Sequence, residues 1–436
     1  MYKYFNQSFS YLIFFSAFIF LFTILNHDLI GLISILLTCL AVSIICNFWK
    51  SVATILYTAL TVRIIFILLG SNSSITLPDS FGDTIIFEQQ AWEWSKGGFL
   101  KVFEYFPGPN TYFISWLAAI PYSLFGRSLI MLQSITLFIS ILVVLLGWHI
   151  GKKLWNEHSA KKISWILALF PSLVLYSGLF LRETYIYFFL MISINGIIGW
   201  VRFDNMRSFF LASFGFIGVF FFHGPMLIGY FVFLTIVLFS IIKKFIIALT
   251  HNYIYKNIFI IAPFIVILFG SYYLGKFNIP KLNDFNRVTN FEFLSKRMQK
   301  NIKGDAAYSK WLVIKEPSEF LYKTPVKVFV FMFSPFPWDV KKLSHLMGVI
   351  DSLFFIFISY LVFCNRKAIL NNAVLRTILI ILITYIILFS LGVGNFGTGI
   401  RHRSKFIFFF ILMAAPLIPK IVFFNRNKNK LKSNKF

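Results

Sequence analysis

Long apolar runs recur along the whole chain and constrain its fold more than any other feature. About 20 apolar residues in an α-helix cross the roughly 30 Å hydrocarbon core of a bilayer. We therefore expect an all-α, polytopic membrane protein with about twelve transmembrane helices. The expected spans are residues 10–26, 29–46, 52–69, 128–150, 162–181, 184–201, 208–222, 225–242, 256–274, 345–363, 374–392 and 404–423.

Basic residues set the expected orientation, because cytoplasmic loops carry an excess of Lys and Arg. The basic groups agree with one another only if the short apolar segment 111–125 does not cross the membrane. Fifteen residues rise about 22 Å as a helix, less than the hydrocarbon core. We expect 111–125 to be an interfacial or re-entrant helix, with both termini in the cytoplasm. The groups expected there are Lys152-Lys153, Lys161-Lys162, Arg202 to Arg207, Lys243-Lys244, Arg366-Lys367 and the tail.

This topology divides the chain into four parts. They are an N-terminal membrane domain with a first outer loop, an outer-face loop with a re-entrant end near Pro335 and Pro337, C-terminal spans, and a basic cytoplasmic tail. The outer-face loop is itself basic, which longer loops tolerate and which fits an anionic substrate. The alternative is one miscounted span, which would reverse everything after it. The parts are 1–275 (loop 70–127), 276–343, 344–424 and 425–436.

Charge and cysteine content exclude several classes of protein. The net charge of +25 is spread over short loops, so we expect no nucleic-acid partner. The three cysteines, Cys39, Cys46 and Cys364, lie in or beside apolar runs without pairing or metal spacing. A disulfide framework and a zinc site are therefore not expected. The first apolar run has no small-residue cleavage site after it and is interpreted as a retained anchor.

Two carboxylates, Asp79 and Asp83, lie one helical turn apart in the first polar stretch after the N-terminal spans. They precede an amphipathic helix whose apolar stripe contains Phe87, Ala91 and Trp94, the form of a helix lying in the membrane interface. If that helix begins before Asp83, the carboxylates share a face; if it begins just after, Asp83 is its N-cap. A carboxylate at the membrane edge suits general-base catalysis on a hydroxyl. Asp83 is the catalytic candidate, with Asp79 as its helper.

Arginines on the same expected face are candidates for binding an anion. Arg182-Glu183 interrupts an otherwise apolar stretch, either as a tight turn with an ion pair or as a phosphate contact. Arg401-His402-Arg403 follows a glycine-rich turn, 392–399. Glycines let backbone N–H groups approach an anion, and arginines bind phosphate bidentately. The alternative for this segment is a flexible loop with interfacial anchors.

Weaker candidates lie on the same expected face. His223, in a Phe-His-Gly-Pro turn, and Asp339, after two prolines, also have ordinary structural interpretations. Arg127 and Arg297 complete the set of basic candidates. Ionisable residues at the ends of spans are functional candidates because they are costly inside a membrane.

The order and spacing of several short motifs resemble the N-terminal half of integral-membrane glycosyltransferases of the GT-C fold, the relatives of protein O-mannosyltransferases and the aminoarabinose transferase. The resemblance covers about residues 60–200. It rests on Gly82-Asp83-x3-Phe87-x3-Ala91, Pro107-x-Pro109-x2-Tyr112, Pro121, Gly126-Arg127, Gly151-Lys-Lys and Pro171 ahead of Arg182-Glu183.

The resemblance implies a catalytic aspartate in the first outer loop, here Asp83, and interfacial jaw helices. It implies a sugar donor linked to polyprenyl phosphate or pyrophosphate, and a glycan, lipid or protein acceptor. Some members of the class use a divalent metal and others do not, so no cofactor is assigned. The expected location is a bacterial inner membrane with the site facing the periplasm, in surface-glycan assembly.

Two alternatives remain. The segments Gly397-Thr-Gly-Ile-Arg-His-Arg403 and Ser334-Pro-Phe-Pro-Trp-Asp339 resemble O-antigen and capsule repeat-unit polymerases. The Arg-x10-Gly pattern of those polymerases occurs at Arg207, on the expected cytoplasmic side. A lipid-linked glycan flippase or transporter should carry ionisable groups near mid-membrane. Arg63 is the main such residue, and a side chain of its length can snorkel to the interface.

Overall fold

The computed structural model describes residues 28–71, 82–250, 291–302 and 304–419, and within these ranges the chain is helical, without strands. One isolated β-bridge joins Ala307 to Asn395. The α-helices are α2 (Leu29–Phe48), α3 (Ala53–Ser71), α4 (Asp83–Ser95), α5 (Phe99–Val102), α6 (Phe113–Phe125), α7 (Leu129–Leu154), α8 (Glu157–Leu169), α9 (Pro171–Gly178), α10 (Glu183–Phe203), α11 (Met206–Phe222), α12 (Leu227–Thr250), α15 (Phe291–Asn301), α16 (Phe320–Phe333), α17 (Leu343–Cys364), α18 (Arg366–Asn371), α19 (Ala373–Gly392), α20 (Phe396–Arg403) and α21 (Ile407–Ala414). Short 3-10 turns are η1 (Phe103–Tyr105), η2 (Gly224–Met226), η3 (Lys310–Leu312), η4 (Pro317–Glu319), η5 (Pro337–Asp339) and η6 (Ser404–Phe406).

Seven helices in the described ranges are long and apolar enough to cross a membrane, so the chain is a membrane-embedded protein: α2, α3, α7, α10, α12, α17 and α19. Each corresponds to one expected span. The expected spans 10–26 and 256–274 lie outside the described residues. The other three are not single long helices, and the number twelve is therefore not confirmed.

Each of these three segments lacks a single helix long enough to cross the membrane, and the structure gives a reason for each. Segment 162–181 is split at Pro171 into α8 and α9. Segment 208–222 is a 17-residue helix, α11, which rises about 26 Å, below the hydrocarbon thickness. Segment 404–423 begins as the turn η6 and continues as the eight-residue α21.

Arg63 stabilises the interruption between α8 and α9. Pro171 has no N–H and cannot continue a helix hydrogen-bond ladder, so α8 ends inside the apolar core with unused carbonyls. Arg63, only 1% exposed, donates to Ala168 O (2.7 Å) and Leu167 O (3.1 Å), and within its own helix to Ala59 O (3.2 Å). The expectation that Arg63 snorkels to the interface is therefore wrong: a cation stabilises a helix C-terminus instead.

Replacing Arg63 with methionine is expected to lower the thermal unfolding temperature of the purified protein. The change leaves buried carbonyls of α8 without donors, at about 1–3 kcal/mol for each unsatisfied group. Arg207→Met is the matched control, because Arg207 is exposed on α11. Equal unfolding temperatures for the two variants would contradict the capping role.

The bundle has two ends that differ in chemistry. At one end the C-termini of α7 and α10 meet, where Arg202 donates to Lys153 O and Lys153 donates to Asn195 Oδ1 at 2.7 Å. Lys244 pairs with Asp204 at the same end. Glu183, the first residue of the 21-residue α10, lies at the other end, about 30 Å away. We call these the Lys153 end and the Glu183 end; which of them faces outside stays a prediction.

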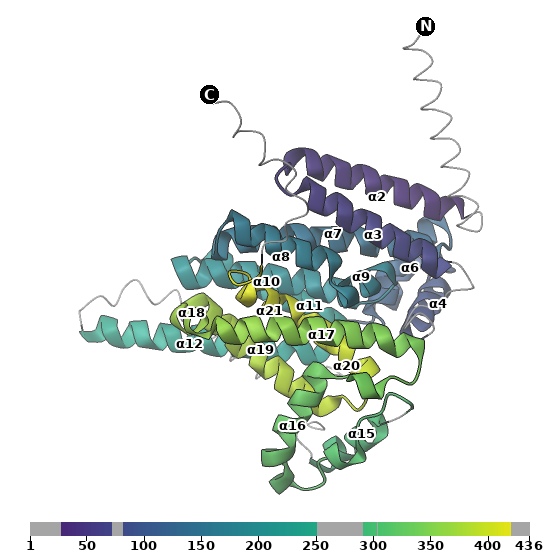
Figure 1. The fold of residues 1–436 in the computed structure, drawn as a ribbon. Helices are drawn as coiled ribbons and strands as arrows, with labels where there is room; N and C mark the ends of the chain where they lie inside the picture. The colour runs from purple at the N-terminus through teal and green to yellow at the C-terminus, as the bar shows by residue number, and fades with distance from the viewer. Residues whose placement is uncertain (1–27, 72–81, 251–290, 303, 420–436) are drawn as a thin grey trace, which may run out of the picture.

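One hydrophobic cluster runs from Leu32 to Ile418 and includes residues of both halves of the chain. Helix α10 packs against α11, α7 and α19, and α19 also packs against α12 and α16 (Figure 1). Small residues bring α10 and α11 together: a Cβ on Gly196 would lie 2.3 Å from Ala212 N. Such small-residue contacts let membrane helices approach closely. In Figure 1, α2 and α3 lie on one side of the bundle and α15 and α16 on the opposite side.

Helices α4 and α6 pack on each other at the Glu183 end. The buried stripe of α4 contains Phe87, Glu88, Ala91 and Ser95, spaced as one helical face. It runs through Ser95 and not, as expected, through Trp94, which is partly exposed and stacks on Tyr105. Whether α4 and α6 lie in the membrane interface stays a prediction.

Candidate functional site

Asp83 begins α4 but does not cap it. The N-cap is Gly82, without a side-chain hydrogen bond, so the capping interpretation of Asp83 is wrong. Its carboxylate instead accepts from Arg401, with Arg401 Nη1 and Asp83 Oδ2 2.7 Å apart. This contact joins positions 318 residues apart in the chain.

Arg401 also holds Glu183. Its Nε donates to Glu183 Oε1 at 2.8 Å, so one guanidinium bridges two carboxylates from separate helices. The Glu183 side chain is 0% exposed, that of Arg401 14% and that of Asp83 41%. Asp83 is therefore the member of the three that a ligand can reach.

Two further cations lie near these residues, and Arg182 interacts electrostatically with Glu183, Arg401 and Asp83. Lys405 Nζ is 3.6 Å from Glu183 Oε1, and the Arg182 guanidinium carbon lies 5.7 Å from the centre of the Phe87 ring. We call Asp83, Arg182, Glu183, Arg401 and Lys405 the Asp83–Arg401 cluster. With Lys405 protonated it contains three cations and two carboxylates, so a single negative charge would then neutralise it.

Polar atoms of the cluster are buried without hydrogen-bond partners among the described residues. They are Arg401 Nη2, Arg182 Nε and Glu183 Oε2. Such groups are costly and call for an explanation in each case. Burial lowers the pKa of Arg182 from its ordinary value, although Glu183 opposes the change. Burial would lower the pKa of Arg401 as well, but Glu183 and Asp83 hold it above its ordinary value, so Arg401 stays charged.

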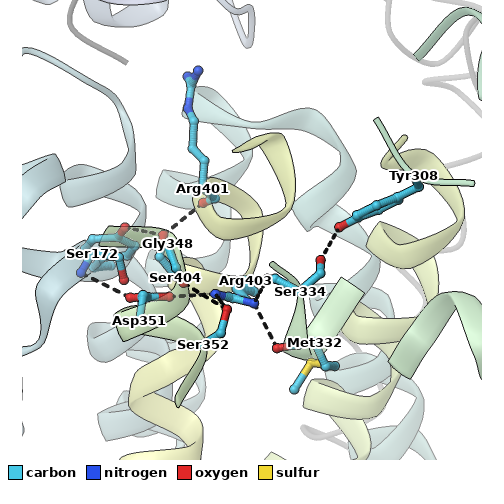
Figure 2. Close-up of polar contacts among 11 residues, drawn as sticks. Ser172, Tyr308, Met332, Ser334, Gly348, Asp351, Ser352, Arg401, Arg403 and Ser404 are labelled. Carbon is cyan, nitrogen blue, oxygen red and sulfur yellow. Dashed lines mark hydrogen bonds and ion pairs between the residues drawn. The ribbon is translucent and has the colours of Figure 1, made fainter. Parts of the chain in front are cut away.

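Arg403 does not join this cluster. Figure 2 shows its side chain pointing away from that of Arg401, although both residues lie on α20. Arg403 is 0% exposed and donates to Asp351 Oδ2 (2.9 Å), Ser352 Oγ (2.8 Å), Met332 O (3.0 Å) and Ser334 O. Both of its terminal nitrogens are therefore engaged with α16 and α17, and it has no terminal donor left for a phosphate.

Arg127 is likewise paired. Its Nε and Nη2 each lie 2.8 Å from an oxygen of Glu88, and Tyr122 donates to Glu88 Oε1 at 2.9 Å. The arrangement joins α4, the end of α6 and the start of α7, so it fixes the helix that carries Asp83.

The two histidines lie beside the cluster. His402 Nδ1 is 2.8 Å from Lys405 Nζ. The rings of His402 and His223 have centres 5.5 Å apart. His223 follows the last residue of α11. His402 therefore borders the cluster through Lys405, and His223 packs against His402.

Of the three other candidates, Asp339 is described and lies outside the cluster. Asp339 accepts from Phe336 N at 2.8 Å and so stabilises the turn after Pro335. The side chain of Arg297, on α15, and the whole of Asp79 lie outside the described residues.

The glycines before Arg401 allow close packing against neighbouring residues. A Cβ on Gly394 would lie 2.5 Å from the backbone of Asn301, and one on Gly399 would lie 2.5 Å from Tyr308 Oη. Tyr308 N donates to Gly394 O at 2.9 Å and Phe396 N to Ala306 O at 2.9 Å. Asn301, Ala306 and Tyr308 thus cover the turn.

Lys405 and Asp351 are the polar residues that sequence reasoning missed. Lys405 lies in an apolar run counted as a span, yet its spacing of four from Arg401 places both on one helical face. Asp351 is the sole acidic residue of α17, a signal that identifies ionisable groups inside membranes. In the part of the chain that the structure describes, no group of three His, Cys, Asp or Glu side chains is placed to hold a metal ion.

The Asp83–Arg401 cluster is therefore a partly exposed carboxylate held by a buried, net cationic group at one end of a helical membrane bundle. Neither a family model, nor a curated protein, nor a solved structure matches the chain.

Proposed function

We propose that this protein is a membrane glycosyltransferase that moves a sugar from a polyprenyl-phosphate or pyrophosphate donor to an acceptor on the outer side of a bacterial inner membrane. The observation that carries the proposal is the bridge from Arg401 to Asp83 and Glu183. The bridge joins the three sequence segments that contain the candidates for base and phosphate contact.

Asp83 suits the role of general base. In the proposed step the acceptor hydroxyl oxygen bonds to the anomeric carbon while the bond from that carbon to the phosphate oxygen breaks. The hydroxyl proton passes to Asp83, and the lipid phosphate leaves with the bonding pair. A base must lie within hydrogen-bond reach of the proton that it takes. The exposed carboxylate of Asp83, oriented by Arg401, can meet that need.

Arg182 and Arg401 suit the leaving phosphate. Each has a buried nitrogen without a partner among the described residues. Preorganised donors in a water-poor site stabilise developing negative charge. One phosphate charge would balance the excess cation of the cluster. Arg403 is assigned a structural role, because its terminal nitrogens are engaged with Asp351, Ser352 and backbone carbonyls.

The other two functions have less support. Arg207, which carries the polymerase-like pattern, lies at the start of α11. That residue is near the Lys153 end and remote from Asp83. Arg63, the residue that would fit a transporter, donates to backbone carbonyls. A glycosyltransferase is therefore the better explanation of where the charged residues lie.

Asp83→Asn is expected to reduce glycan transfer at least about 100-fold, since a positioned base contributes 10²–10⁴-fold. Surface glycan of the native host is scored by gel, with the protein level checked by blot. Glu93→Gln is the matched control, because Glu93 lies on the same helix, is exposed and pairs with Lys96. Unchanged glycan in Asp83→Asn would overturn the assignment, and a product limited to one repeat would favour the polymerase.

A further inference from the structure

Helix α16 turns its lysines inward and its apolar side chains outward. Lys323 and Lys327, one turn apart, are 4% and 5% exposed, and Phe331 continues the same buried face. Val326 and Phe329 on the other side are exposed. The helix lies at the edge of the bundle, opposite α2 and α3 (Figure 1). Ionisable side chains turned toward the interior of a membrane protein are costly there and mark functional sites.

Lys323 is the compensated member of the pair. Its Nζ lies 2.7 Å from Glu319 Oε1 and donates to Val313 O at 2.8 Å. The centre of the Trp311 ring is 5.7 Å from the same nitrogen. These contacts join α16 to the segment that precedes it, so burial of Lys323 has a structural explanation.

Lys327 lacks such compensation. Its ammonium has no hydrogen-bond acceptor and no carboxylate partner among the described residues, and its charged neighbour is Lys323, a second cation. Burial and, to a lesser extent, the charge of Lys323 lower the pKa of Lys327 to about 8. The side chain is therefore still mostly charged at pH 7. A buried charge without a partner is costly unless another group supplies one.

A hydroxyl beside Lys327 is also unsatisfied. Thr324 lies three residues earlier, and side chains with this spacing are neighbours on the surface of a helix. Its Oγ1 is buried and has no hydrogen-bond partner in the part of the chain that the structure describes. Two adjacent donors without acceptors thus lie on the inner side of α16. A single anion would accept from both, which explains two groups that are otherwise unfavourable.

We propose that Lys327 and Thr324 bind a phosphate group, carried by an anionic lipid or free in solution. Lysine binds phosphate as a point charge, and a hydroxyl donates to its oxygens. The exposed apolar side of α16 favours the lipid, because basic sites between membrane helices hold lipid head groups while the acyl chains cover apolar side chains. The site uses no residue of the Asp83–Arg401 cluster, and the inference does not rest on the proposed function.

The test uses the purified full chain in detergent and follows thermal unfolding during titration at matched ionic strength. The probes are dihexanoyl phosphatidylglycerol, dihexanoylglycerol, which lacks the phosphate, and sodium phosphate. Phosphatidylglycerol is expected to stabilise the protein more than dihexanoylglycerol does. Lys327→Met is expected to weaken the apparent affinity at least about tenfold, and Thr324→Val about threefold. Lys310→Met is the matched control, because Lys310 is an exposed lysine of the same region.

Two further readouts distinguish a ligand site from a structural lysine. Without ligand, Lys327→Met is expected to unfold at the wild-type temperature or above, because the change removes an uncompensated buried charge. Raising the pH from 7 to 9 should weaken binding of phosphatidylglycerol about tenfold in the wild type, since Lys327 must regain its proton to bind. The phosphodiester keeps its charge over this range, and Lys323 remains paired with Glu319. Lys327→Met should show no such dependence.

The outcomes separate the two sources of the phosphate. A Lys327-dependent effect of phosphatidylglycerol alone assigns the site to a lipid, and an equal Lys327-dependent effect of sodium phosphate assigns it to free phosphate. Equal affinities in Lys327→Met and Lys310→Met overturn the proposal. A lower unfolding temperature of ligand-free Lys327→Met also overturns it, because the lysine would then have a structural partner.

Discussion

Arg401→Gln is expected to abolish glycan transfer and to lower the thermal unfolding temperature of the protein. The change removes the donor that orients Asp83 and leaves Glu183, fully buried, without its closest cation. Breaking a buried ion pair in this way costs about 3–5 kcal/mol. Loss of a preorganised donor costs transfer at least about 100-fold. Surface glycan and the unfolding temperature are measured on the same preparations.

The double variant Arg401→Gln with Glu183→Gln separates the two effects. Removing the buried charge together with its closest partner is expected to restore part of the unfolding temperature, because Glu183 is then neutral while Lys405, 3.6 Å from it, loses its carboxylate. Glycan transfer is expected to stay absent. Recovery of transfer in the double variant would show that Arg401 acts only in folding and would contradict its place in the site.

Arg403→Met is expected to destabilise the protein by a similar amount, about 3–5 kcal/mol, through the unpaired Asp351. Arg403 and Asp351 are both buried, and the arginine also joins the end of α16 to α17. Activity per folded molecule is expected to stay near that of the wild type. The unfolding temperature and the transfer rate, normalised to the folded fraction, are the two measurements.

A matched rescue exists for this pair too. Arg403→Met with Asp351→Leu replaces a buried ion pair by apolar side chains, which is often neutral or stabilising. The double variant should therefore unfold at a higher temperature than Arg403→Met. A folded but inactive double variant would contradict the structural role of Arg403 and would support a role in binding phosphate.

These two arginines also show how far sequence reasoning reaches. The sequence groups Arg401 with Arg403 as anion contacts because both follow the same glycine-rich turn, 392–399. The segment is helical from Phe396, and residues two apart on a helix point about 200° away from each other. A local error about secondary structure therefore placed two side chains in one site when they belong to opposite faces.

The long helices were predictable because hydrocarbon thickness fixes their length and apolar content. The interrupted segments were less so. Pro171 predicts that the helix is interrupted. The Arg63 contacts that stabilise this interruption join residues more than 100 positions apart. Hydrophobic periodicity is a local pattern and does not predict such contacts. The expected topology predicts that Asp83, Glu183 and Arg401 lie at the same end of the bundle. Their pairing required the packing of α4, α10 and α20.

Arg63 has a consequence for how the chain is made. Its acceptor Leu167 O comes from a residue 104 positions later, so at about 5–20 residues per second the ribosome needs about 5–20 s to supply it. During that time α3 carries an arginine without its α8 partners, at about 2.5–3.5 kcal/mol for insertion into lipid. The carbonyls of α8 remove part of this cost once α8 has emerged, so the final placement of α3 depends on a helix that is made later.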